Sequence, residues 1–290
     1  MMISIRGVFV LTFVWLTAAA ASDGQVFLQY NLTPKQNFSY ESTSAVTQSM
    51  SAMDQDVAST TTIATKLHVS VKDAVVRQYT VECRYDTARI RLQTQGAEGM
   101  LPQDSAITLP MLANKKETLT LSPRGTILST TAHDDDDLQV TMSSMSALGG
   151  TGAKAVFPEF AGKELAVGNS WTVTTSDTVS RSQMPGNILT TSKLRYTFQG
   201  VVDTLGVRCA RIGVSSEEMS MSGSMQAMGM EMALDGEGET HGTMYVEVST
   251  GMQVLSRMSS TLNARMSMTG QGQAIVPITT ETVTTLRRLP

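Results

Sequence analysis

Several runs of this chain alternate between apolar and polar residues at every second position. Such alternation is typical of a β-strand with one buried face, because successive side chains of a strand point to opposite faces of a sheet. Thr and Val are frequent in these runs, and their branched side chains suit a pleated surface. The runs therefore predict a mainly β fold of antiparallel strands. Their apolar positions are Ile63, Leu67, Val69 and Val71, then Leu194, Tyr196 and Phe198, and finally Met244, Val246 and Val248.

Helical periodicity is confined to two short segments. In residues 138–148 apolar residues recur at spacings of three, and the pair Gly149-Gly150 that follows can end a helix. Residues 103–113 form a weaker candidate. We therefore expect an antiparallel sheet with one or two short helices.

Residues 1–21 have the three parts of a secretory signal. Arg6 supplies the positive charge, residues 7–17 form an apolar stretch, and residues 18–21 are all Ala. The apolar stretch is shorter than the roughly 20 residues of a spanning helix, and no Cys lies near the cleavage site to carry a lipid anchor. We expect residues 22–290 to be a single β-rich domain, periplasmic or secreted, with no integral membrane segment and with an oligomeric state that the sequence leaves open.

A Gly-rich connection at residues 149–153 divides the chain, and three landmarks recur in the same order on its two sides. They are an aromatic-bearing strand after a polar turn, a Cys-bearing strand, and two strands joined through a turn with one Gly. The recurrence predicts two similar β halves, residues 24–148 and 155–290, within one continuous sheet. The landmark residues are Phe38 and Trp171, Cys83 and Cys209, and Gly125 and Gly251.

Charge and composition exclude several functional classes. The formal net charge of -4 removes the attraction to phosphate on which nucleic-acid binding depends. Two Cys cannot build a disulfide-rich scaffold or a four-thiolate zinc site, and three His leave little room for histidine chemistry. The common sequence motifs of nucleophilic, metal-dependent and nucleotide-binding enzymes are missing. We expect a protein that is not an enzyme, has no cofactor and has no nucleic-acid partner.

Three short motifs carry a resemblance to known proteins: Gly168-Asn-Ser-Trp171, Tyr196-Thr-Phe-Gln-Gly200 and Ser249-Thr-Gly251. Together with the signal segment they resemble a family of exported bacterial proteins of unknown function. That family is similar in architecture to the half-barrel folds of the lipoprotein carrier LolA, in which a strongly curved sheet wraps helices and an apolar cavity. The resemblance implies a single curved antiparallel sheet, a half-barrel or an open barrel, with a cavity, and it assigns no functional residue.

Methionine is concentrated in the second half of the chain, where 11 of the 20 Met lie between Met219 and Met268. Thioethers are soft ligands suited to Cu(I), so one interpretation is a copper site. A second is an apolar face: a bulge near Gln226-Ala227 would place the cluster on one side of a sheet, as a core or a cavity lining for varied apolar partners. A third is a disordered loop. The copper interpretation uses Met219, Met221, Met225, Met228, Met230, Met232 and His241.

Two further features are open to two interpretations each. The run His133-Asp134-Asp-Asp-Asp137 could hold a hard cation, but it lacks the spacing of a calcium loop and suits a solvated turn before a helix. Cys83 and Cys209 could form a disulfide in an oxidising compartment, or remain two separate buried thiols.

The sequence thus supports three hypotheses. The first is an exported, non-enzymatic protein that binds a lipid, a lipidated protein or another hydrophobic ligand in a groove of its sheet. The second is a Met-rich periplasmic copper-binding protein, and the third is an envelope module that acts through protein contacts. The expected groove-lining residues of the first hypothesis are Trp171, Tyr196, Phe198, Met221, Met230 and Met266.

Overall fold

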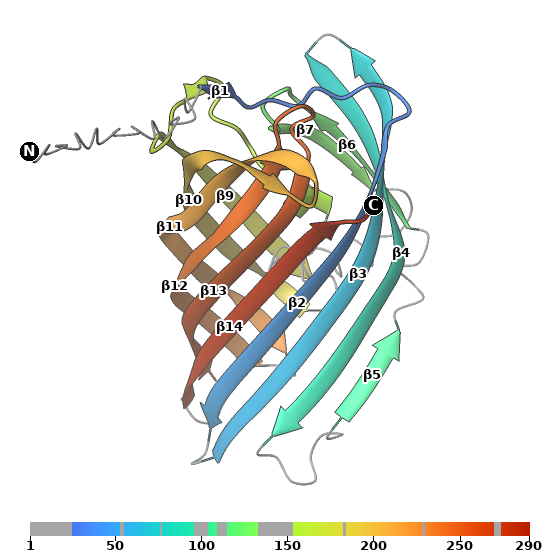
Figure 1. Ribbon diagram of the computed structural model, residues 1–290. Coiled ribbons are helices and arrows are strands. Elements are labelled where there is room, and N and C mark those ends of the chain that lie inside the picture. The colour runs from blue at the N-terminus through green and yellow to red at the C-terminus, as the bar shows by residue number, and fades with distance from the viewer. Residues whose placement is uncertain are drawn as a thin grey trace, which may run out of the picture.

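Most of the chain that the computed structural model describes is β-strand (Figure 1). The structure describes residues 25–52, 55–75, 77–95, 104–108, 115–132, 153–181, 184–227, 230–269 and 274–290. The strands of the first half are β1 (Val26–Phe27), β2 (Asn37–Ala52), β3 (Gln55–Val75), β4 (Gln78–Gln95), β5 (Asp104–Thr108), β6 (Lys116–Leu121) and β7 (Ile127–Ala132). Those of the second half are β8 (Glu164–Leu165), β9 (Ser170–Arg181), β10 (Met184–Thr204), β11 (Val207–Ala227), β12 (Met230–Glu247), β13 (Gln253–Thr269) and β14 (Ala274–Arg288).

Twelve of these strands form one large antiparallel sheet in the order β7-β6-β4-β3-β2-β14-β13-β12-β11-β10-β9, with β5 added on β4. The sheet is strongly curved and is not closed, because β7 and β9 are the two ends of this order and do not pair within the described residues (Figure 1). β1 and β8 form a separate two-stranded sheet. The prediction of a mainly β fold with a single curved antiparallel sheet is confirmed.

Two meanders meet in the middle of the sheet. Strands β2 to β7 belong to the first half of the chain and β9 to β14 to the second, and β14 pairs with β2 from Ile278–Met50 to Arg288–Tyr40. The predicted halves 24–148 and 155–290 contain one meander each. Their origin from one repeated unit stays a prediction.

The predicted helices fare differently. Residues 104–108, inside the candidate segment 103–113, form strand β5 on the edge of β4, so a helix there is wrong. Backbone pairing with β4 makes this segment a strand, and the spacing of its apolar residues does not reveal that pairing. The candidate 138–148 and the signal segment 1–21 lie outside the described residues. Within the described part of the chain, the one helical element is a 3₁₀ turn, η2 (Ala153–Val156).

The alternation predicted from the sequence is seen in the sheet. Ile63, Leu67, Val69 and Val71 are buried on the inner, concave side, whereas Lys66 is exposed on the outer side. The cross-strand register carries this division across the neighbouring strands, since partners in register share a face. Every long strand therefore has an inward and an outward set of side chains.

The main core fills the upper end of the sheet as drawn in Figure 1. Two segments, residues 25–36 and 153–169, cross this end and pack their apolar side chains against inward residues of the sheet. Tyr30 is completely buried, its ring lies 5.1 Å from that of Phe160, and its hydroxyl donates to the Pro158 carbonyl at 3.1 Å. Gly125 takes φ of 90° against the Tyr30 ring, where a Cβ would lie 2.7 Å from that ring. We call residues 25–36 and 153–169 together the strap.

Candidate functional site

Below this core the concave face of the sheet changes character. In this lower part, the inward positions of β2, β3, β4 and β10–β14 hold apolar, hydroxyl, amide or glycine residues, and no charged side chain among those described. The inward Arg288 lies above it, at the upper end of β14 beside Tyr40 and Phe38. The inward Asp177 on the edge strand β9 is an exception at the margin. The charged residues of these strands point outward, among them Glu41, Lys66, Arg89, Arg195, Asp235, Glu237, Glu239, Arg257, Arg265 and Glu281. We call this uncharged inward surface the lower concave face.

A band of hydroxyl groups crosses the top of the lower concave face. Ser44 and Thr284 share a buried hydrogen bond of 3.0 Å, and Thr240 and Ser260 share one of 2.7 Å. Each bond joins two neighbouring strands, β2 with β14 and β12 with β13. Pairing satisfies these hydroxyls without a formal charge, so the band is polar and neutral.

Methionine and glycine face one another within and below the band. Inward glycines on β12 lie beside methionines of the neighbouring strands. Met221 pairs with Gly236, and a Cβ at Gly242 would lie 2.5 Å from the Met258 sulfur. Met219 covers Gly238 in the same way and accepts a hydrogen bond of 3.5 Å from Thr240. The glycines thus leave room for flexible thioether side chains.

The sequence did carry a signal for this arrangement. Along β12 glycine alternates with charged residues, with Gly236, Gly238 and Gly242 inward and Asp235, Glu237, Glu239 and His241 outward. Glycines that alternate with charged residues have the two-residue period of a strand. A search for apolar residues at every second position does not detect them. A Cβ at Gly236 would also lie 2.7 Å from the Ala264 Cβ, so the packing of this strand against β13 excludes larger side chains.

The structure divides the six predicted groove-lining residues into two groups. Trp171, Tyr196 and Phe198 belong to the upper core, where the Trp171 and Tyr196 rings stack at 5.4 Å and the Trp171 indole donates to the Glu159 carbonyl of the strap at 2.9 Å. Met221 and Met266 are half-buried on the lower concave face. Met230 begins β12, and its side chain lies outside the described part of the structure.

The methionine cluster reaches one face by a different route from the predicted bulge. Residues 226 and 227 lie at the end of β11, and the chain turns back so that Met225 pairs with Met232, which in turn pairs with Met268 of β13. Across this hairpin the inward residues change from odd-numbered at this end of β11 to even-numbered on β12, so both groups of methionines share one face. The bulge of this strand lies earlier, near Glu217, between the pairs Ser215–His241 and Ser220–Glu237.

The full ligand set of the copper interpretation does not come together. Met219, Met221, Met225 and Met232 face inward, whereas His241 points outward and lies on the other face of the sheet. Met228 lies outside the described residues. Three thioethers of the cluster, those of Met225, Met232 and Met268, remain neighbours across three strands.

Cys83 and Cys209 are two separate, free and buried thiols. Cys83 lies on β4 and Cys209 on β11, and five strands separate β4 from β11 in the sheet, so a disulfide is excluded by geometry. Burial raises the pKa of the Cys209 thiol to about 11, and it raises the pKa of Cys83 further. Both thiols therefore stay protonated and behave as small apolar core groups.

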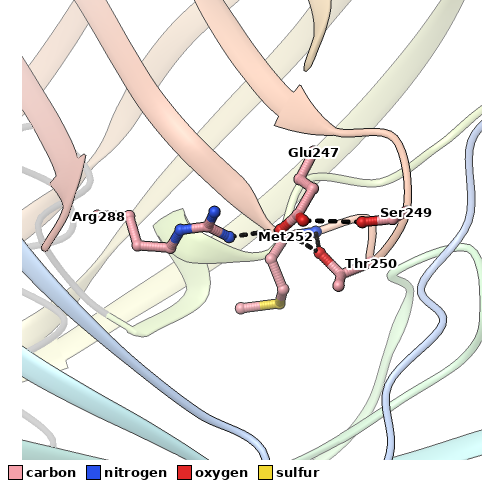
Figure 2. A network of polar contacts seen from close by, with 5 residues as sticks. All are labelled: Glu247, Ser249, Thr250, Met252 and Arg288. Carbon is pink, nitrogen blue, oxygen red and sulfur yellow. Dashed lines mark hydrogen bonds and ion pairs between the residues drawn. The ribbon is translucent and has the colours of Figure 1, made fainter. Parts of the chain in front are cut away.

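Glu247 is the centre of a polar network at the upper end of the second meander (Figure 2). Arg288, at the end of β14, donates to its carboxylate at 2.7 Å, and the hydroxyls of Ser249 and Thr250 donate at 2.7 and 2.8 Å. Burial alone would raise the pKa of Glu247, but these donors hold it below its ordinary value. Since Arg288 and Glu247 satisfy one another, the network fastens β14 to the β12–β13 turn and leaves no reactive group free.

A second polar chain on the outer face joins three side chains of neighbouring strands. The Ser39 hydroxyl lies 2.7 Å from Nδ1 of His68, and Nε2 of His68 lies 2.6 Å from the Asp86 carboxylate, which also pairs with Arg84 at 3.2 Å. The residue types are those of a nucleophile, base and acid triad. A hydrolase also needs backbone N–H groups aimed at the oxyanion, and here β2 and β3 pair continuously through Ser39 and His68. The arrangement is a surface hydrogen-bond chain in the ladder.

Glu117 is the one acid of β6 that points inward, beside the buried Cys83 and Tyr85. Burial raises the pKa of Glu117, and the nearby Lys154 lowers it only in part. The Tyr85 hydroxyl accepts a hydrogen bond of 2.9 Å from the Ala153 amide, which ties this corner of the sheet to η2. Glu117 thus lies in the wall between the strap and the sheet.

No group of three or more His, Cys, Asp and Glu side chains in the described ranges is arranged to hold a metal ion. The acidic run 133–137 falls outside those ranges. Among the described residues there is also no helix of the length and hydropathy that crossing a membrane requires.

Comparison with known proteins gives no family. No family model matches the chain, and no curated protein matches it. Among solved structures, OccAB4 of Acinetobacter baumannii is similar with a TM-score of 0.24 and 8% sequence identity, over 89% of this chain and 99% of that one. A similarity of this degree assigns no function, and the resemblance to exported proteins of unknown function stays a prediction.

Proposed function

We propose that the protein is an exported, non-enzymatic binding protein whose curved sheet holds a lipid or another uncharged hydrophobic ligand on the lower concave face. The observation that carries this proposal is the separation of charge between the two faces of the sheet. Charged side chains of the long strands project outward, and the lower concave face has none on β2–β4 or β10–β14 among the described residues. Placing an ion against such a surface is costly, whereas apolar surface is stabilised there.

The side chains of the lower concave face suit a ligand of variable shape. Met221, Met225, Met232, Met266 and Met268 are only half-buried, in contrast to the closed core above them. Unbranched thioethers repack at little cost when an apolar partner changes. A hydroxyl band above them offers neutral hydrogen-bond partners to a headgroup.

The test uses a charge placed on this face. The neutral fluorophore N-phenyl-1-naphthylamine serves as the probe, and we expect Met221→Glu to weaken its binding about tenfold or more, because a carboxylate disfavours an apolar neighbour. The matched control is Ser222→Glu, which places the same charge at the next residue, exposed on the outer face. Met266→Lys provides a second variant of opposite charge on the same concave face.

Native mass spectrometry of the protein purified from its own cells completes the test. We expect a co-purifying neutral lipid that is lost or reduced in Met221→Glu and retained in Ser222→Glu. Equal probe binding in both variants would place the ligand elsewhere. Absence of both probe binding and a co-purifying lipid would reject the proposed function in favour of the contact module.

A further inference from the structure

The outer face of the sheet carries a hollow of about 740 Å³ over β12, β13 and β14. Its lining includes Tyr245, Leu255, Arg257, Ser259, Val283 and Thr285. These side chains have the outward parity of their strands, because the alternate positions Met244, Ser256 and Leu286 are buried in the inner face. The hollow is therefore separate from the lower concave face, and the sheet lies between them.

Arg257 occupies the central row of this hollow, between Thr243 of β12 and Thr285 of β14. None of the residues that line the hollow is acidic. The acids of outward parity nearest to this row on the three strands are Glu239 and Glu281 on one side and Glu247 on the other. Each lies four residues along its strand, roughly 13 Å at 3.3 Å per residue, and Glu247 is held by Arg288.

The Arg257 guanidinium has no ion pair within the described part of the chain. Other outward cations do have one: Lys72 pairs with Glu82 at 3.0 Å, and Arg84 with Asp86 at 3.2 Å. A guanidinium presents a fork of donors that matches a carboxylate. The hydroxyls of Thr243, Ser259 and Thr285 add neutral donors around it.

Apart from these polar groups and His241, the hollow is lined by apolar side chains. Val283 is 38% exposed, a large fraction for an aliphatic residue in the middle of a sheet, and it lies one outward row from Arg257. Half-buried Leu255 and Tyr245 lie in the outward row on the other side of Arg257. A ligand that fits both parts has one negative charge and a short apolar body. We propose that the hollow is a second binding site, for a small amphiphilic carboxylate. This proposal is independent of the ligand of the lower concave face.

The test compares octanoate with octanol by isothermal titration calorimetry. Octanoate is expected to bind, and Arg257→Gln to weaken its binding about tenfold or more, because a charge-assisted hydrogen-bonded pair is lost. The matched control is Arg265→Gln, on the same strand and face but opposite Asp235 and Pro277, outside the hollow. Its octanoate affinity should stay within about twofold of the parent. Val283→Ser should weaken octanoate binding a few fold through lost apolar contact.

Three results would overturn the proposal. Octanoate affinity that is unchanged in Arg257→Gln, or lowered equally in Arg265→Gln, would show that Arg257 does not receive the carboxylate. Octanol binding as tightly as octanoate, and weakened to the same degree by Val283→Ser, would show that the hollow does not recognise charge. A failure of octanoate to bind at millimolar concentration would show that the hollow is not a carboxylate site.

Discussion

The upper core and the lower concave face are built on the same strands but have different interiors. At the upper end, aromatic and branched side chains of the sheet meet the strap, and Tyr30, Phe160 and Phe198 are almost completely inaccessible. On the lower concave face the inward residues are methionine, glycine, serine and threonine, and many are only half-buried. The difference indicates that the upper end supplies most of the stability and the lower end can change its packing without loss of the fold.

The largest expected effect is in the upper core. Phe160→Ala removes a fully buried ring that packs on Tyr30, and should lower the free energy of unfolding by about 3–5 kcal/mol. Met266→Ala on the lower concave face should cost about 1 kcal/mol, because its side chain is already partly exposed. Urea unfolding of the two variants measures both. Equal losses would mean that the two regions do not differ in stability.

The second-largest expected effect on stability is in the Glu247 network. Glu247→Gln leaves the nearly buried Arg288 without a counter-charge, and should cost about 1–3 kcal/mol at pH 7. The pKa of Glu247 is lowered in the folded protein, so its stabilisation is present above the ordinary value of about 4.5 and is lost as the pH falls through the folded value. The cost of Glu247→Gln should therefore shrink at pH 3. Unfolding measured at pH 7 and pH 3 tests this, with the exposed Glu281→Gln as control, and a cost independent of pH would contradict it.

Glu117 should change stability with pH in the opposite direction to Glu247. Its pKa is raised by burial, so the protonated form is favoured in the folded protein, and stability falls as the pH rises from about 4.5 through the folded value. We expect Glu117→Gln to stabilise the protein by about 1 kcal/mol at pH 8 and to make no difference at pH 4. Thermal unfolding at the two pH values measures this. Destabilisation at pH 8 would show that the carboxylate is paired in the wall of the core.

The smallest effect is expected on the outer face. Ser39→Ala and Asp86→Asn break the chain through His68, whose side chain is 40% exposed, so each should change stability by about 0.5 kcal/mol or less. Chemical unfolding in low and high salt measures the change. A loss as large as that of Glu247→Gln would mean that this chain supports the sheet as the buried network does.

The sequence predicted the faces of the strands well. The alternation at Ile63, Leu67 and Val69, and at Tyr196 and Phe198, correctly separates inward from outward residues, because burial on one face of a strand selects apolar residues locally. The strand period is a property of neighbouring residues and needs no knowledge of the partner strand. The single sheet was predicted from the landmarks that recur in the two halves of the chain, and its curvature from the resemblance to half-barrel folds.

The contacts between distant segments could not be predicted in this way. Arg288 reaches Glu247 across 41 residues, and Tyr30 reaches Pro158 across 128, and neither pair leaves a periodic pattern in the sequence. The bulge near Glu217 shifts the register of β11 by one residue. Alternation alone placed this bulge at the wrong position, near Gln226-Ala227. Pairing with β4, in turn, made a strand of residues 104–108, where apolar spacing suggested a helix.

The pairing of β2 with β14 has a consequence for how the protein is assembled. Each meander joins neighbours in sequence, so either one can begin to form before the rest of the polypeptide is present. The seam between them is different, because it joins residues 40–50 to residues 278–288, and closing so long a loop is slow. The continuous sheet therefore comes into being only after β14 has arrived, and until then two half-sheets with exposed edges must be kept from pairing with other molecules.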